Sequence, residues 1–315
     1  MKSILVTGCA GFIGSNLIDR LLKEGVTVVG VDNFDNYYDP KVKRGNLANA
    51  KKFKGFRFYE NDILASAELQ KIFKKENIEK VIHLAARPGV RHSLIDPIFY
   101  AKNNIEGTVK LLEISSLFKV RRFIFASSSS VYGQSEKIPY EETANIDSLA
   151  SPYGASKRCG EFFVESFYKS KGLKSIIFRF FTVYGMRGRP DMAPALFSKA
   201  ILKGKKISQF GDGESFRDYT FIDDIVQAII AGLESLVDFA IINLGNDNPV
   251  KLKDFIKQIE QLTGKEAGIR KLPNQIGDVE KTWASIVKAK ELLDWKPQTK
   301  LEDGLKSYIK WLKQS

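Results

Sequence analysis

The chain has 315 residues, of which 43% are hydrophobic, and its 49 basic and 37 acidic side chains give a formal net charge of +12. This length and composition suit one large or two moderate globular domains and exclude a largely disordered chain. Basic residues are interspersed with acids and accompany no nucleic-acid-binding motif, so we expect no nucleic-acid partner and attribute the charge to a solvated surface or an anionic small-molecule substrate.

The N-terminal segment predicts a glycine turn between a strand at 3–7 and a helix that extends to about residue 23. The turn includes Gly8, Gly11, Phe12, Ile13 and Gly14. Such glycines let backbone N–H groups approach a pyrophosphate at a helix N-terminus. The Gly-x-x-Gly-x-x-Gly spacing differs from the Gly-x-Gly-x-x-Gly fingerprint, so the turn alone is a weak signal.

The same segment contains neither a signal peptide nor an apolar span, which predicts a cytoplasmic protein with no membrane partner. The two cysteines, Cys9 and Cys159, stand far apart and in no metal-ligand spacing. We therefore expect neither a disulfide framework nor a metal site.

A second apolar strand at 26–31 leads into Asp32, eighteen residues after Gly14. A carboxylate at this distance hydrogen-bonds the adenosine ribose of NAD and repels the 2′-phosphate of NADP. The alternative is a turn aspartate that caps the Asp32–Asn33 loop. Together with the glycine turn, Asp32 predicts NAD as cofactor.

Strand and helix patterns alternate through the first half of the chain, with further strands expected at 56–60, 80–84, 122–127 and 175–180. This order predicts an α/β fold with a doubly wound parallel sheet. We expect a Rossmann domain over 1–180 and a mainly substrate-binding domain over 181–315. The apolar run at 239–244, within the segment 220–246, is expected to return to the first sheet.

Tyr153 and Lys157 are four residues apart, which places both on one face of a helix. A nearby ammonium favours phenolate over phenol and moves the tyrosine pKa toward working pH, so Tyr153 is a candidate base for a sugar hydroxyl. The pair by itself is weak evidence, because the spacing is common by chance. Ser128 is the candidate partner of Tyr153, although the serine run at 127–130 also suits a polar loop.

These motifs together resemble the extended short-chain dehydrogenase/reductase family. The resemblance rests on the glycine turn, Asp32, the segments 62–63 and 83–86, the serine run before 131–133, and Tyr153 with Lys157. Within the family the chain is most similar to NAD-dependent nucleotide-sugar epimerases, and in particular to UDP-glucuronate 4-epimerases, through 32–40 and 182–193. It differs at Met186–Arg187, where the family usually has Pro-Trp.

The resemblance implies a role for each matching residue. NAD would be held by Gly8, Gly11, Phe12, Ile13, Gly14, Asp32, Asn33, Asp62, Ile63, Leu84, Ala85, Ala86, Tyr153 and Lys157. A UDP-sugar would be held by Arg91, Ser128, Ser129, Ser130, Thr182, Arg189, Arg217 and Asp278. Alternatives remain for three of these: Arg187 competes with Arg189 for a sugar carboxylate, Arg217 suits a surface ion pair with Asp218, and Asp278 suits a turn.

The residues before 131–133 bear on the reaction. Related 4,6-dehydratases have an Asp-Glu pair there and related decarboxylases a Glu, whereas this chain has Ser129 and Ser130. Without an extra acid and base, oxidation and re-reduction at C4 is the simplest chemistry. We expect a UDP-glucuronate 4-epimerase that acts as a homodimer. Open alternatives are a UDP-hexose or UDP-N-acetylhexosamine 4-epimerase, a UDP-uronate decarboxylase and a catalytically inactive NAD sensor.

Overall fold

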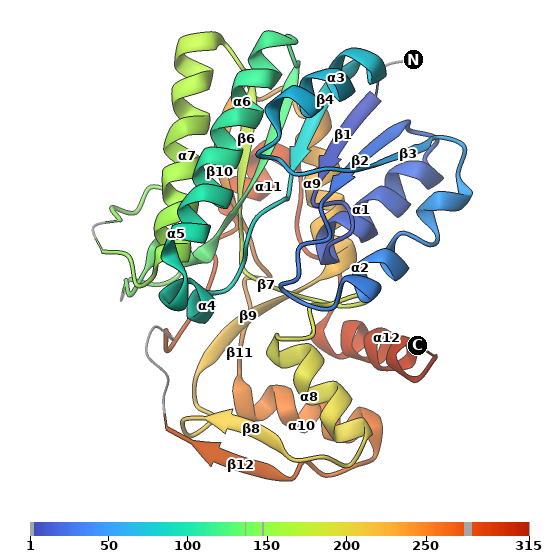
Figure 1. Ribbon diagram of the computed structural model, residues 1–315. Coiled ribbons are helices and arrows are strands. Elements are labelled where there is room, and N and C mark those ends of the chain that lie inside the picture. The colour runs from blue at the N-terminus through green and yellow to red at the C-terminus, as the bar shows by residue number, and fades with distance from the viewer. Residues whose placement is uncertain (1–2, 136, 147, 274–278, 315) are drawn as a thin grey trace.

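A seven-stranded parallel sheet forms the centre of the protein (Figure 1). The computed structural model describes residues 3–135, 137–146, 148–273 and 279–314. The strand order is β10-β6-β5-β4-β1-β2-β3. In chain order the strands are β1 (Ser3–Thr7), β2 (Val28–Asp32), β3 (Phe56–Glu60), β4 (Ile78–His83), β5 (Arg122–Ser128), β6 (Ser175–Phe180) and β10 (Phe239–Leu244). The predicted doubly wound sheet is confirmed.

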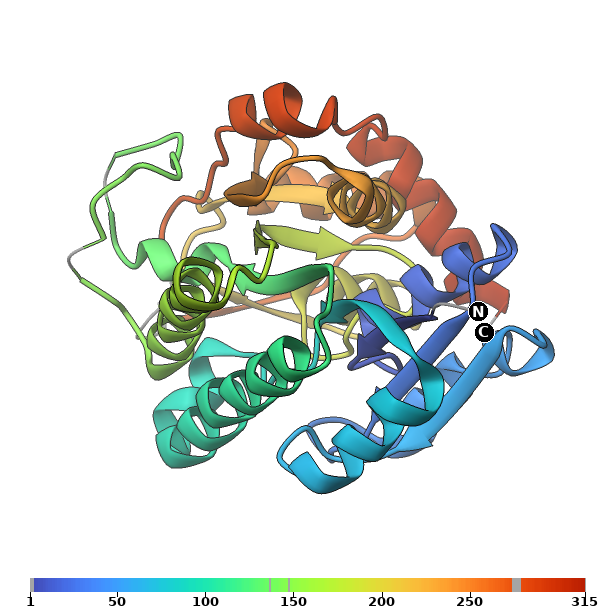
Figure 2. The same ribbon diagram turned by 90° about the horizontal axis from the view of Figure 1, so that it is seen from above.

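Helices cover both faces of this sheet, which appears as the middle layer when seen from above (Figure 2). One face is covered by α3 (Ser66–Glu76), α6 (Gly107–Leu117) and α7 (Pro152–Lys171), and the other by α1 (Phe12–Lys23), α9 (Ile222–Glu234) and α11 (Val287–Leu293). Successive strand residues point to opposite faces, so Leu5 and Val6 belong to different core clusters. Burial on both faces explains why these strands are continuous apolar runs.

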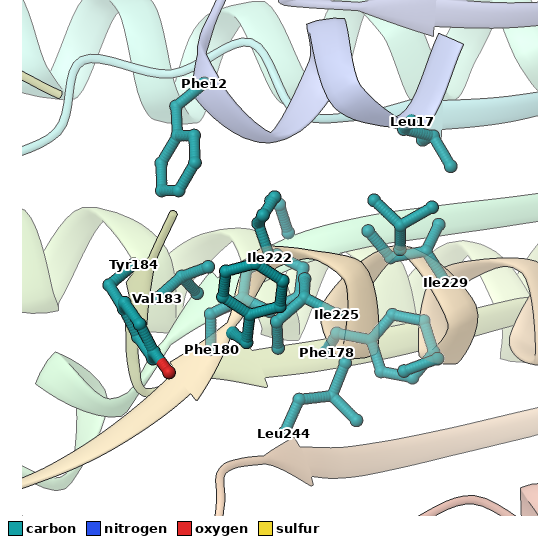
Figure 3. Packing of buried hydrophobic residues seen from close by; sticks show 14 of the residues in the cluster. Phe12, Leu17, Phe178, Phe180, Val183, Tyr184, Ile222, Ile225, Ile229 and Leu244 are labelled. Atoms are coloured by element: carbon teal, nitrogen blue, oxygen red, sulfur yellow. The ribbon is translucent and has the colours of Figure 1, made fainter. Parts of the chain in front are cut away.

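The core beneath α1 joins the two halves of the chain. Figure 3 shows Ile222, Ile225 and Ile229 of α9 packed between Phe12 and Leu17 of α1 and the phenylalanines of β6. The neighbouring strand β10 pairs with β6 from Phe239 to Leu244. This is the strand that the apolar run at 239–244 predicted. The division into domains at residue 180 stays a prediction.

A smaller lobe lies below the sheet in Figure 1. It consists of β8 (Ile207–Phe210), β12 (Ile269–Leu272), α8 (Ala193–Leu202) and α10 (Leu252–Thr263). A three-stranded sheet of β7 (Thr182–Tyr184), β9 (Phe216–Phe221) and β11 (Pro249–Lys251) links it to the main sheet. The remaining elements are α2 (Pro40–Asn46), α4 (Val90–Ile95), α5 (Pro97–Tyr100), α12 (Leu301–Gln314), 3-10 turns at Ala50–Lys52 and Ser129–Tyr132, and a π-helical stretch at Ala101–Glu106.

The bounds of β2, β4 and β5 differ from the predicted ones by one or two residues, and β5 ends at Ser128 rather than residue 127. β2 begins at Val28 rather than residue 26, because the N–H of Val26 donates to the carbonyl of Leu21 and closes the end of α1 instead of joining the sheet. β4 begins earlier than predicted, at Ile78. Of the helices in the described ranges, none is both long and apolar enough to cross a bilayer.

Candidate active site

A cavity opens at the carboxyl ends of the sheet strands, where parallel α/β folds bind ligands. Most of the residues that we predicted to be functional from the sequence line this cavity. These are Gly8, Gly11, Phe12, Ile13, Gly14, Asp32, Asn33, Ile63, Leu84, Ala85, Ala86, Ser128, Ser129, Ser130, Tyr153, Lys157, Thr182 and Arg189. Most of the predicted cofactor and sugar residues therefore line one cavity.

The glycine turn allows a ligand to approach the protein backbone closely. Gly8 has φ +68, and a Cβ on it would lie 2.7 Å from the backbone nitrogen of Ala85. A Cβ on Gly14 would collide with the carbonyl oxygen of Gly8. Helix α1 begins directly after Gly11, so its unpaired N–H groups and positive end face the cavity. This cradle fits the pyrophosphate of a dinucleotide.

Asp32 ends β2 as a buried carboxylate. Its two oxygens accept N–H groups of Ala10 (3.1 Å) and Phe34 (2.8 Å), and burial raises its pKa. A carboxylate has about four acceptor sites, so lone pairs remain for a ligand's hydroxyls. Asn33 donates to Asp62 at 2.9 Å, and of the two only Asn33 is among the lining residues.

Tyr153 and Lys157 lie in the first two turns of α7. Ser151 caps this helix by accepting the N–H of Gly154 at 3.1 Å, and Pro152 occupies its first turn, so the helix start is well defined. The Lys157 ammonium donates to the carbonyl of Ala126 in β5 at 2.7 Å. Ser128 and Tyr153 both line the cavity, and the Ser128 side chain favours the ionised form of Tyr153.

In this structure the pKa of Tyr153 is raised, not lowered as the spacing with Lys157 predicted. Burial raises the pKa of Tyr153, and the groups that oppose the rise are Ser128 and the positive charge of Arg189. Lys157 is itself fully buried, which lowers its pKa to about 7 although Glu161 favours the charged form. Desolvation thus outweighs the pairing of phenol and ammonium that the spacing alone indicated.

The structure separates the two candidate arginines at the sugar end. Arg187 has φ 62 and turns away from the cavity, donating to the carbonyl of Ser15 (2.9 Å) and to Asp19 (2.7 Å) on α1. Asn16 of the same helix donates to the carbonyl of Met186 at 3.1 Å. Met186 and Arg187, which stand where the family usually has Pro-Trp, therefore fasten this loop to α1. Of the two arginines, it is Arg189 that lines the cavity.

Arg189 is paired with Asp191. Its Nε and Nη2 donate to the two carboxylate oxygens at 3.0 and 2.6 Å, and the hydroxyl of Tyr37 donates to the same carboxylate at 2.9 Å. The ion pair raises the pKa of Arg189 and lowers that of Asp191. Both groups are therefore charged at neutral pH.

Two predicted substrate residues, Arg91 and Arg217, are not among the described lining residues. Arg91 packs on the ring of Phe210, and Arg217 lies in β9 and donates to the carbonyls of Phe216 (2.8 Å) and Glu280 (3.3 Å). The structure has no Arg217–Asp218 ion pair within the ranges it describes; Asp218 instead accepts backbone N–H groups of Asn246 and Ala284. Asp278 lies outside the described residues.

Sequence reasoning missed several polar residues that line the cavity: Asp35, Tyr37, Lys43, Asn61, Arg87 and Asn103. Asn61 directly follows β3, and Asp35 lies three residues after the end of β2. Their positions just after strand ends were the signal that could have predicted them as lining residues. Arg87 forms an ion pair with Asp35, and Lys43 donates to the Asp35 carbonyl at 2.7 Å. The Arg87–Asp35 pair joins segments 52 residues apart, which no local pattern reveals.

A sequence model of the family described as GDP-mannose 4,6 dehydratase matches residues 5–308. The chain belongs to this family of extended short-chain dehydrogenases/reductases. One family member, a UDP-glucuronate 4-epimerase of Thermodesulfobacterium geofontis, is 45% identical over all of this chain and 97% of its own length.

Solved structures of family members agree over the whole chain. The UDP-glucuronic acid 4-epimerase of Bacillus cereus in complex with UDP-glucuronic acid and NAD has a TM-score of 0.93 and 39% identity, with 100% of this chain and 99% of that one covered. The UDP-glucose 4-epimerase of Thermotoga maritima with UDP-glucose has a TM-score of 0.92 and 35% identity at the same coverage.

Proposed function

We propose that the protein is an NAD-dependent 4-epimerase that interconverts UDP-glucuronate and UDP-galacturonate. The observation that carries the proposal is the meeting of Tyr153, Ser128 and Arg189 in one cavity whose other end has the glycine cradle and Asp32. The first group suits proton transfer at a sugar hydroxyl beside a carboxylate-binding cation. The second suits a dinucleotide.

The lining also argues against dehydration. Among the described lining residues the carboxylates are Asp32 and Asp35, both from the segment at the end of β2. Next to Tyr153 the lining offers the three serines 128–130 instead. Water elimination needs an acid and a base at the sugar in addition to the tyrosine, so epimerisation is favoured although the family description names a dehydratase.

The cofactor fits the residues present. The α1 N-terminus and Gly8 would hold the pyrophosphate, Asp32 the adenosine ribose, and Ile63 with Leu84 the apolar surfaces of the rings. When bound, NAD supplies reversible hydride transfer at C4. Asp62 would act through Asn33, to which it is hydrogen-bonded.

Tyr153 is the proposed base that removes the 4-hydroxyl proton and later returns one. Ser128 would hold that hydroxyl against the phenol oxygen, and Lys157, anchored on the Ala126 carbonyl, would lie on the nicotinamide side. Inversion requires the 4-keto sugar to turn within the cavity, so the reaction depends on positioning in two orientations. The small side chains of Ser129 and Ser130 leave room for that turn.

Oxidation of a uronate at C4 creates a β-keto acid, which loses CO₂ when its carboxylate aligns with the carbonyl π system. An epimerase must therefore hold the carboxylate out of alignment. Arg189, with Thr182, is the proposed grip, since both line the cavity near Tyr153. Arg189 also favours ionisation of Tyr153 through its charge.

Roles for Arg91, Arg217 and Asp278 in holding UDP stay predictions, as does a cytoplasmic location. We further propose a homodimer. Exposed apolar side chains on α4, α5 and α7 supply a surface for it, namely Leu94 (47% exposed), Ile95 (82%), Ile98 (80%) and Phe162 (54%). Sedimentation of the purified protein tests this assembly.

The deciding experiment is product analysis with a panel of UDP-sugars on the NAD-loaded enzyme. UDP-glucuronate should give UDP-galacturonate with little pentose product, and UDP-glucose or UDP-N-acetylglucosamine should react more slowly. A UDP-pentose as the main product would make the enzyme a decarboxylase. Faster turnover of UDP-glucose would assign it to the hexose epimerases.

A further inference from the structure

The cation proposed to grip the sugar carboxylate already has a carboxylate partner in its own loop. Asp191 accepts from Nε and Nη2 of Arg189, the edge of the guanidinium that binds a carboxylate in two-point fashion. The Arg189 and Asp191 side chains are 21% and 32% exposed, so the pair is only partly screened by water. Arg189 lines the cavity, and Asp191 is not among its described lining residues.

Asp191 is itself held in place from another segment. The Tyr37 hydroxyl donates to its Oδ2 at 2.9 Å and lies 3.2 Å from Nδ1 of His92 in α4. Desolvation raises the pKa of Asp191, but Arg189 and Tyr37 more than offset this and hold it below the usual value. The aspartate is thus a fixed anion at neutral pH rather than a proton carrier.

A guanidinium has five N–H donors, and Asp191 uses two of them. A sugar carboxylate arriving at Arg189 meets the remaining donors and, behind them, a like charge. A neutral hydroxymethyl group meets no such repulsion. The charge of Asp191 therefore acts against a uronate and is nearly neutral toward a hexose.

We propose that Asp191 is a specificity-determining residue whose carboxylate competes with the C6 carboxylate of the substrate for Arg189 and so weakens uronate binding relative to UDP-hexose binding. This inference rests on the proposed function. The competing interpretation, in which Asp191 only orients Arg189, predicts the opposite sign. Loss of orientation would weaken uronate binding, whereas loss of competition strengthens it.

The test compares two NAD-loaded proteins, the Tyr153→Phe variant and the same variant with Asp191→Asn added. Tyr153→Phe is present in both so that binding is measured without turnover. Calorimetric titration with UDP-glucuronate, UDP-glucose and UDP gives three affinities for each protein. Asp191→Glu keeps the charge on a longer side chain and should not reproduce the effect. Asp238→Asn, which removes the carboxylate of the exposed Lys174–Asp238 pair, is the matched control.

We expect D191N to tighten UDP-glucuronate binding roughly tenfold and to change UDP-glucose and UDP binding by less than about twofold. Unchanged or weaker UDP-glucuronate binding overturns the proposal, and equal tightening of all three ligands does so too. Asp191→Ser makes the same neutral change if D191N does not fold. If the wild-type protein binds UDP-glucuronate but does not convert it, the proposed function is refuted and the proposal for Asp191 is not.

Discussion

Glu161, one turn after Lys157 on α7, forms a buried ion pair with Arg179, and Glu161→Gln should destabilise the protein strongly. Each side chain is 1% exposed. Arg179 donates to both carboxylate oxygens at 2.9 and 2.8 Å, and the hydroxyl of Ser127 donates to one of them at 2.6 Å. Arg158 also donates to this carboxylate, at 2.7 Å. Glutamine keeps the shape but leaves both arginines without this counter-ion, and Arg179 is the one that is fully buried.

Breaking one side of such a pair costs about 3–5 kcal/mol, because a buried charge is left uncompensated. A typical domain has only about 5–15 kcal/mol of stability, so the loss is a large fraction of the whole. The control is Glu234→Gln. Glu234 pairs with Lys80 at 2.7 Å but is 65% exposed, so this change should cost no more than about 1 kcal/mol.

Urea unfolding of each variant, followed by circular dichroism, measures these free energies. The double variant E161Q/R179M removes the fully buried cation as well and should recover much of the loss, since the other partner of Glu161, Arg158, is 22% exposed and reaches solvent. If E161Q unfolds at the same urea concentration as the Glu234→Gln control, the pair does not contribute as described.

The same variant should affect catalysis through Lys157. Glu161 favours the charged lysine, whose pKa burial lowers to about 7. Glutamine removes that support, so the folded-state pKa of Lys157 should fall further and its positive charge should be lost at lower pH. The alkaline limb of the kcat profile should move to lower pH, which a variant that is merely less stable would not show.

Other substitutions test the proposed roles directly. Tyr153→Phe should keep UDP-sugar binding while kcat falls by roughly 10²-fold or more, measured by product formation; near wild-type turnover would assign the proton transfer to another group. Asp32→Ala should reduce the NAD that copurifies with the protein, and preferential NADP in wild type would contradict the ribose assignment. Arg189→Ala should lower uronate turnover and raise the share of CO₂ among the products; an unchanged CO₂ share at reduced turnover would leave Arg189 a role in binding but not in holding the carboxylate out of alignment.

The elements that could be predicted are those whose physical cause is local. Residues 175–180 and 239–244 are apolar runs between polar segments, and both are strands with those bounds. The glycine turn was predictable because only glycine fits the approach of Gly8 to Ala85. Tyr153 and Lys157 share a helix, as their spacing requires.

The parts that could not be predicted depend on tertiary contacts. Arg187 and Arg189 are two residues apart, and their different directions follow from the positive φ of Arg187 and its contacts with α1. The raised pKa of Tyr153 depends on burial that spacing does not encode. Asp191 was visible in the sequence, but its pairing with Arg189 and Tyr37 brings distant loops together.

The fastening of the 186–187 loop to α1 gives the two halves of the cavity a shared support. The helix whose first turn faces the dinucleotide also holds, through Asn16 and Asp19, the loop that presents Arg189. Whatever factor a bound dinucleotide adds to the affinity for a nucleotide sugar, the sugar adds the same factor to the affinity for the dinucleotide. A dinucleotide that tightens the binding of the sugar is therefore itself held more tightly while the sugar is bound.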